Sequence, residues 1–197
     1  MGDGKIALLE EAVRMADTLG DIDEGFAVRE ELMEAANEWG RPDIELVAYA
    51  WCLAQYDKDP DRFNHEEHSL MWTYKRILGT LMAFPSIPRS RIESAFEDYK
   101  SRLERLSRPL SPHDEFRLRF ELHRGDANAV ERAYSQFKRH GKASELDCRA
   151  WQPHAEVRYQ LFKGNLEAGI EAAQVLFKKH APNCNRIPHA THGIVLE

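Results

Sequence analysis

The 197-residue sequence has few cysteines and no long apolar segment. Its three cysteines are Cys52, Cys148 and Cys184, and so sparse and odd a number predicts reduced thiols rather than a disulfide framework. The longest apolar stretch, residues 77–84, is interrupted by a glycine and a threonine and is far shorter than the ~18 residues of a membrane span. The N-terminal residues have neither the basic region nor the apolar run of a signal peptide. We therefore expect a cytoplasmic protein.

A surplus of positive charge is also missing. The formal net charge is −6, acidic and basic residues are interspersed, and 43% of the residues are hydrophobic, which is enough to form a core. A dedicated nucleic-acid-binding protein usually has a basic surplus. The longest basic clusters, Arg89–Arg91 and Lys178–Lys179, are too short to favour an anionic membrane surface. We expect neither nucleic acid nor a membrane as a partner.

The motifs of common catalytic chemistries are absent. No serine lies in a Gly-x-Ser-x-Gly setting, and no glycine-rich phosphate loop follows a strand. The adjacent carboxylates of Glu30 and Glu31 point to different sides of a helix, so we expect them to be solvated. The segment His65–His68 places its histidines three residues apart, whereas the zincin motif needs four, and it is interpreted as a solvated helix start. We expect no enzymatic activity and no cofactor.

Apolar residues recur with a helical period along most of the chain. The clearest stripe has the spacing i, i+4, i+7, i+11, i+14 and consists of Ile92, Phe96, Tyr99, Leu103 and Leu106. Similar stripes predict helices at 4–18, 22–39, 43–56, 67–84, 89–106, 112–123, 127–140, 150–163 and 166–180. A tenth helix is expected to begin near Pro188. The segment Phe116–Leu122 alternates like a strand, but its helical neighbourhood favours a helix there too.

Polar and glycine residues between the stripes predict short turns. Ser90 and Glu93 have the spacing of a capping box, in which each side chain caps a backbone N–H at the start of a helix. Asp126 follows Gly125, and Asn165 follows Gly164, so one helix is expected to end and the next to be capped within two residues. Consecutive helices joined by such turns lie antiparallel.

Two late segments, 116–141 and 157–180, each have the order helix, glycine turn, helix, and their turn glycines lie 39 residues apart. This order resembles the tetratricopeptide (TPR) repeat, although the Trp-x-x-Leu-Gly-x-x-Tyr signature is absent and the period exceeds the usual ~34 residues. We predict an all-α fold of antiparallel helix hairpins in a TPR-like, right-handed superhelical array of about nine or ten helices. Residues 1–197 would form a single domain, and we expect the array to continue past Glu197.

Three stretches carry a closer resemblance. They are Leu70–Ile77 with Phe84–Pro88, then Leu146–Cys148, and finally Cys184–His189. With these stretches the chain resembles a family of uncharacterised bacterial TPR-like proteins. The resemblance implies Asp-Cys-x-x-Cys at the second stretch, but this chain has Trp151 at the second cysteine position. It implies a helical-repeat fold and no particular activity.

A metal site is an alternative function for the cysteines. Thiolate and imidazole groups suit Zn²⁺, and four of them complete a tetrahedral site. The candidate ligands are Cys148, Cys184, His189 and His192. They would make the chain a zinc-binding or thiol-based sensor protein. The competing interpretation is that the thiols are small buried side chains and the histidines lie on the surface.

A binding groove is the function that the repeat pattern favours. Trp72, Tyr74 and Lys75 are too close in sequence for all three to be buried on one helix, so one of them is expected to face a groove. In TPR arrays the first helix of each pair lines the concave side. This makes three arginines candidates for binding a carboxylate or an acidic segment, namely Arg117, Arg119 and Arg124. We predict a protein- or peptide-binding scaffold, with a second copy of the chain as one form of partner. The alternative is an exposed charged helix face.

Overall fold

The computed structural model describes residues 2–82, 84–140 and 150–180, and over these residues the regular secondary structure is entirely helical. The described helices are α1 (Gly2–Leu19), α2 (Ile22–Glu38), α3 (Pro42–Lys58), the short 3₁₀ helix η1 (Asn64–Glu66), α4 (Glu67–Leu81), α5 (Arg89–Arg105), α6 (Ser111–Arg124), α7 (Ala127–His140), α8 (Trp151–Phe162) and α9 (Leu166–His180). The all-α prediction is confirmed, and every predicted helix is present within three residues of its expected ends. The tenth helix expected near Pro188 lies outside the described residues.

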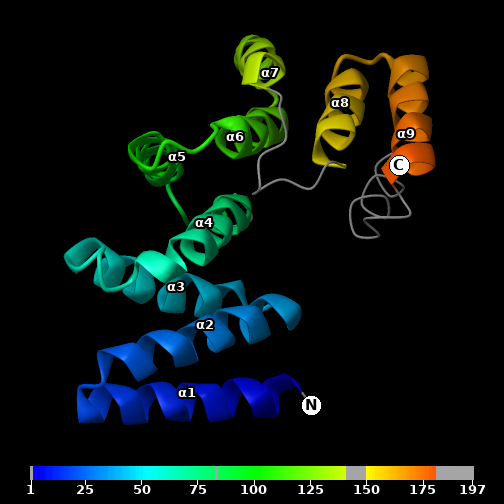
Figure 1. The fold of residues 1–197 in the computed structure, drawn as a ribbon. Coiled ribbons are helices and arrows are strands. Elements are labelled where there is room, and N and C mark those ends of the chain that lie inside the picture. The colour runs from blue at the N-terminus through cyan, green and yellow to red at the C-terminus, as the bar shows by residue number, and fades with distance from the viewer. Residues whose placement is uncertain (1, 83, 141–149, 181–197) are drawn as a thin grey trace. The chain divides into compact units, whose positions relative to one another are not determined.

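The chain divides into two compact units, residues 1–80 and 81–197. In the first unit α1 packs on α2, and α2 packs on α3 (Figure 1). Short turns connect these helices. Asp21 caps α2, because its Oδ1 accepts a hydrogen bond of 3.1 Å from the backbone N–H of Glu24. The core contains a stacked pair of rings, Phe26 and Phe63, with centroids 4.6 Å apart.

Helix α4 is fixed against α3 within the first unit. The Tyr49 hydroxyl donates a hydrogen bond of 3.3 Å to the carbonyl of Leu70, and the rings of Tyr49 and Tyr74 lie 5.4 Å apart. All three residues are buried. With these contacts in place, the side of α4 that bears Ser69 and Thr73 faces α2.

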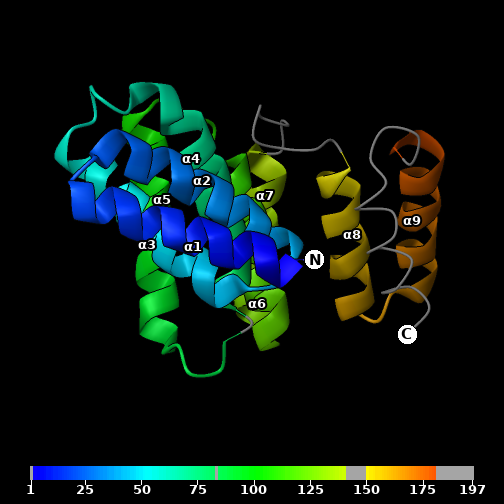
Figure 2. The same ribbon diagram turned by 90° about the horizontal axis from the view of Figure 1, so that it is seen from below.

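The second unit contains two antiparallel hairpins, α6 with α7 and α8 with α9 (Figures 1 and 2). Helix α6 packs on both α7 and α8. Gly125 ends α6 in the left-handed region at φ 75°, a backbone conformation that glycine adopts without steric strain. Asp126 then caps α7, since its Oδ1 accepts a 3.0 Å hydrogen bond from the backbone N–H of Ala129. The predicted turn at Gly125 is therefore confirmed.

Side chains from α7 and α8 tie the hairpins together. The rings of Tyr134 and Tyr159 are parallel, with centroids 3.6 Å apart. The Tyr134 hydroxyl donates to Glu156 at 2.6 Å, and the Tyr159 hydroxyl donates to Glu131 at 2.8 Å, so each tyrosine bonds to the helix of the other. Beneath them lies an apolar cluster that includes Leu118, Val130, Ala133, Phe137 and Ala155.

Helices α8 and α9 approach closely at Gly169. A Cβ atom at this position would lie 2.9 Å from Cδ2 of Leu161. The missing side chain of Gly169 therefore permits the close approach of the two helices.

The capping of two helices differs from the predictions, although both helices begin at the predicted residues. Helix α5 begins at Arg89 with Pro88 as its N-cap, so Ser90 and Glu93 do not form a capping box. Glu93 instead accepts a 2.7 Å hydrogen bond from Arg89 Nε. Asn165 was predicted to cap α9, and its side-chain amide instead donates a hydrogen bond of 3.0 Å to Gln160 Oε1. Trp39, the last residue of the helix predicted at 22–39, lies at the C-cap of α2 and is exposed.

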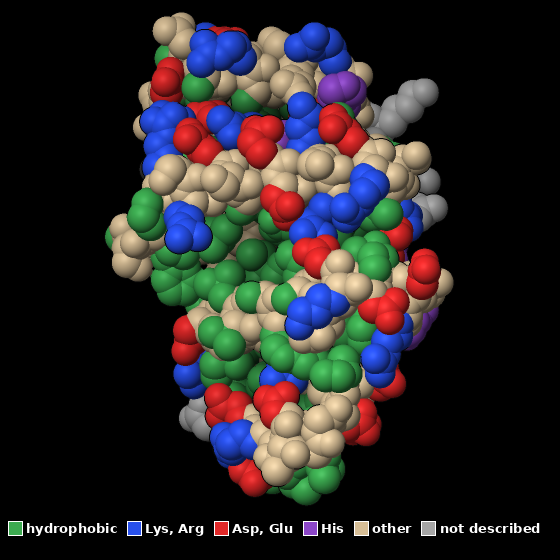
Figure 3. Space-filling view, turned by 90° about the vertical axis from the view of Figure 1, so that its left-hand side faces the viewer, with side chains coloured by type: hydrophobic (Ala, Val, Ile, Leu, Met, Phe, Trp, Pro, Cys, Tyr) green, Lys and Arg blue, Asp and Glu red, His purple; other side chains and the backbone are tan. Residues whose placement is uncertain are grey.

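Among the described helices none has the combination of length and apolar character needed to cross a bilayer. Basic and acidic side chains are interspersed over the face in Figure 3, in agreement with the mixed charge of the sequence.

Candidate functional site

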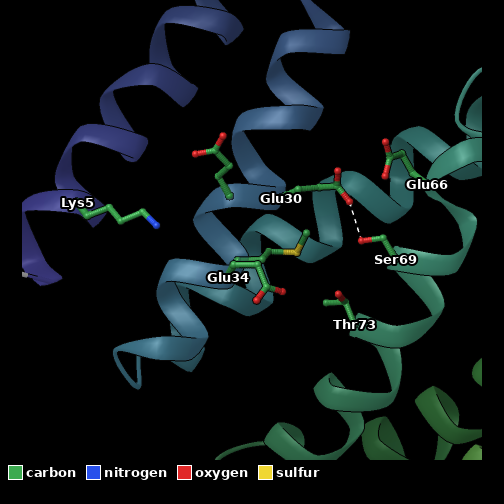
Figure 4. Close-up of a pocket in the computed structure, with 8 residues that line it drawn as sticks. Lys5, Glu30, Glu34, Glu66, Ser69 and Thr73 are labelled. Carbon is green, nitrogen blue, oxygen red and sulfur yellow. Dashed lines mark hydrogen bonds between the residues drawn. The ribbon is translucent and has the colours of Figure 1, made fainter. Parts of the chain in front are cut away.

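The first unit contains a hollow of about 390 Å³ (Figure 4). Its lining comes from α1, α2, η1 and α4 and consists of Lys5, Glu30, Glu31, Met33, Glu34, Glu66, Ser69 and Thr73. Four of these eight residues are glutamates, and only Lys5 is basic.

Helical spacing explains why these side chains meet. Glu30 and Glu34 are four residues apart and lie on one face of α2, and Ser69 and Thr73 have the same spacing on α4. The two rows face each other across the hollow. They are joined by the Ser69 hydroxyl, which donates a hydrogen bond of 2.9 Å to Glu30 Oε1 (Figure 4). Glu66 ends η1, directly before α4, and adds a further carboxylate at the same edge.

Glu30 is half-buried, and this position changes its acidity. Burial raises the pKa of Glu30 to about 7, the neighbouring Glu66 raises it further, and the hydrogen bond from Ser69 lowers it. Near neutral pH the hollow therefore holds a carboxyl group that a nearby cation would ionise.

Arg76 of α4 already binds two carboxylates beside the hollow. Its Nη1 lies 3.1 Å from Glu34 Oε1, and its Nε donates to Glu45. Glu45 is buried on α3, and burial raises its pKa although Arg76 acts in the opposite direction. A guanidinium group thus binds carboxylates of both α2 and α3 next to Glu34, which lines the hollow.

Thr73 is the most deeply buried polar residue of the lining. Its exposed fraction is 3%, and its side chain borders the hollow (Figure 4). Within the described part of the chain, no residue is hydrogen-bonded to its hydroxyl group. The hydroxyl oxygen is not among the fully buried polar atoms that lack a partner, so it is accessible from the hollow and has hydrogen-bonding capacity for its contents.

Of the aromatic and basic trio predicted for a groove, Trp72 is the most accessible. Its exposed fraction is 39%, whereas Tyr74 and Lys75 are buried. The Lys75 ammonium lies 5.2 Å from the centroid of the Trp72 ring. The expectation that the three cannot all be buried is confirmed.

The predicted groove arginines of α6 have two different surroundings. Arg117 and Arg124 both pair with the buried carboxylate of Glu121, at 3.0 Å and 2.7 Å. Each also lies 5.6 Å from the centroid of the Phe120 ring. Their charges therefore already compensate a buried carboxylate.

Arg119 lies instead beside a small space between α6 and α8, together with His154 and Arg158. Burial lowers the pKa of His154 to about 4, and the charges of Arg158 and Arg119 lower it further. The space also borders Glu115. The arginines do not line the larger hollow.

The candidate zinc ligands Cys148, Cys184, His189 and His192 lie outside the described residues. Over the described ranges no group of three or more His, Cys, Asp or Glu side chains is arranged to hold a metal ion. The remaining cysteine, Cys52, is buried in α3, and burial raises the pKa of its thiol to about 12.

The hollow was not predicted from the sequence. Glu31 is exposed as expected, but Glu30 is half-buried and bonded to α4, so the expectation that both are solvated is wrong for Glu30. The available signal was the i, i+4 pair of Glu30 and Glu34, because two like charges on one helix face are unfavourable unless something compensates them.

No family model matches the sequence, and it matches no curated protein and no solved structure. Function is therefore inferred from the geometry of the site.

Proposed function

We propose that this chain is a cytoplasmic, TPR-like helical scaffold that binds a segment of a partner protein and catalyses no reaction. The hollow of the first unit is the observation that carries this proposal. A volume of about 390 Å³ lies in the range of ligand sites, and the lining offers carboxylates, hydroxyls and the thioether of Met33. Such a surface can take one or two side chains of an extended or helical peptide.

The packing of the second unit supports the TPR-like part of the proposal. In helical-repeat proteins each helix pair stacks on the next pair. Here α6 contacts its hairpin partner α7 and also α8, the first helix of the following pair. The same kind of architecture is what the predicted resemblance to bacterial TPR-like proteins implies.

Site-specific photo-crosslinking in cells tests the function. A photoreactive amino acid replaces Glu31, which lies at the exposed rim of the hollow, and in a second strain it replaces Glu97, an exposed residue of α5 that does not line it. We expect a discrete protein adduct from position 31 and none from position 97. Equal adducts from both positions, or none from position 31 and from the further rim positions 5 and 34, would contradict a binding hollow.

A further inference from the structure

The charge around the hollow indicates which partner side chains it accepts. Glu30, Glu31, Glu34 and Glu66 border it, against the single ammonium group of Lys5. Arg76 compensates part of the charge of Glu34, and His65 lies 3.1 Å from Glu66. Negative charge remains in excess, so a cationic group is favoured and an acidic one is repelled.

Arg76 shows how this part of the unit binds a cation. Its guanidinium group reaches from α4 to Glu34 on α2 and to Glu45 on α3. A planar group with several N–H donors suits carboxylates on neighbouring helices. A second cation entering the hollow would meet the same type of acceptor in Glu30 and Glu66.

The unpartnered hydroxyl of the buried residue Thr73 is the second observation, and it is independent of the acidic residues. Thr73 is 3% exposed, borders the hollow and has no hydrogen-bond partner among the described residues. An ammonium group has three donors, and a guanidinium group has five. The hydroxyl oxygen of Thr73 offers such a group one further acceptor beside the carboxylate oxygens.

We propose that the hollow binds a lysine or arginine side chain from a basic segment of the partner, between the carboxylates of Glu30 and Glu66 and the hydroxyl of Thr73. This proposal rests on the scaffold function proposed above. A metal ion is a weaker candidate for the same site, since the described residues include no group of three ligands arranged to hold one.

The methyl group of Met33 provides a direct reporter, because Met33 lines the hollow. The full chain is labelled with ¹³C-methyl methionine and titrated with blocked peptides Gly-Gly-X-Gly-Gly, where X is Arg, Lys, Gln or Glu. We expect saturable shifts of the Met33 resonance with Arg and Lys only. Met15 of α1 is exposed and does not line the hollow, so its resonance should stay in place.

Two substitutions on α4 form a matched pair. Thr73→Val removes the hydroxyl without changing charge and should weaken binding of the Arg peptide by about tenfold, as expected for the loss of one hydrogen bond to a charged group. Thr80→Val is the control, since the Thr80 hydroxyl donates to the carbonyl of Arg76 and does not line the hollow. It should leave the affinity unchanged.

The outcomes separate the two proposals. Equal Met33 shifts with the Gln or Glu peptide would overturn the cationic occupant and leave a binding hollow in place. Equal weakening by Thr73→Val and Thr80→Val would overturn the role of Thr73 in the site. No Met33 shift with any peptide would overturn the occupant, and the crosslinking at position 31 then decides independently whether the scaffold function survives.

Discussion

Nδ1 of His140, at the end of α7, lies 2.6 Å from Oδ2 of Asp114 in the first turn of α6. The other oxygen of this carboxylate, Oδ1, lies 3.0 Å from Nδ1 of His113 and accepts a hydrogen bond of 3.2 Å from the amide of Gln136. Asp114 is only 2% exposed. One buried carboxylate therefore links α6 to α7 at the open end of the hairpin, opposite the turn at Gly125.

Replacing this carboxylate by an amide should loosen the hairpin. Asp114→Asn removes the charge that strengthens the three contacts. Only one of the two terminal atoms of the amide, its oxygen, can accept a hydrogen bond. We expect a loss of about 2–3 kcal/mol in the free energy of unfolding, measured by urea denaturation. Asp61→Asn, at an exposed position, should cost less than about 0.5 kcal/mol. Similar losses in both variants would show that the cluster around Asp114 adds no stability.

Gly125→Ala should destabilise the second unit by about 1 kcal/mol. A Cβ atom there would meet nothing within 4 Å, so the whole cost comes from the left-handed backbone. Gly4→Ala is the opposite case, because Gly4 is helical and its Cβ would also be free of contacts. That change should stabilise α1 by about 0.5–1 kcal/mol. Thermal unfolding distinguishes the two signs, and a stabilising Gly125→Ala would contradict the strained turn.

Glu30 should make stability depend on pH. Its pKa is raised to about 7 from an ordinary value near 4.5, so the folded chain binds a proton that the unfolded chain releases between these values. The contribution of Glu30 to stability is complete below about pH 4.5 and is lost as the pH rises through about 7. The charged and titratable groups around it are Glu66 and His65 on η1, Lys5 on α1, Glu34 on α2 and Cys52 on α3.

Glu30→Gln removes this dependence, because the amide stays neutral. Relative to the unsubstituted chain, the variant should gain on the order of 1 kcal/mol between about pH 5 and pH 8, a figure reduced to allow for the exposed half of the side chain. Denaturation at several pH values measures the gain. Glu31→Gln, at an exposed position, should show no such trend. A gain that is the same at every pH would count against the raised pKa.

Lys5→Ala should strengthen binding of the Arg peptide. The ammonium group of Lys5 is the basic member of the lining and repels a second cation in the hollow (Figure 4). We expect affinity to rise about threefold at low salt and the difference to shrink at high salt, where charges are screened. The Met33 titration measures both. Lys58→Ala, at the end of α3 and outside the hollow, should have no effect.

The helices were predictable from the sequence because their signals are local. A 3.6-residue apolar period and a glycine or capping residue at its end determine a helix with little reference to the rest of the chain, as Gly125 and Asp126 do for α6 and α7. The start of α5 at residue 89 was predicted correctly, but its capping box was not, because Pro88 takes the N-cap position that the Ser90–Glu93 spacing suggested for serine.

The hollow was not predictable, because its parts are distant in sequence. Ser69 and Glu30 are 39 residues apart, and tertiary packing, such as the hydrogen bond from Tyr49 of α3 to the Leu70 carbonyl of α4, brings them together. The same holds for Arg117 and Arg124, whose charges are directed to Glu121 by the burial of that carboxylate. A pattern of residue types indicates where charge lies along a helix, but tertiary packing decides which charges are compensated.

The parallel rings of Tyr134 and Tyr159 have an optical consequence. Two phenol rings in face-to-face contact at 3.6 Å couple their electronic transitions, and both rings are held by hydrogen bonds across the α7–α8 contact. This coupling contributes to the near-ultraviolet circular dichroism, together with the signals of the other aromatic residues, and it should be lost when one hairpin separates from the next, while the far-ultraviolet signal reports helix content. The molecule thus contains a label-free probe of hairpin stacking.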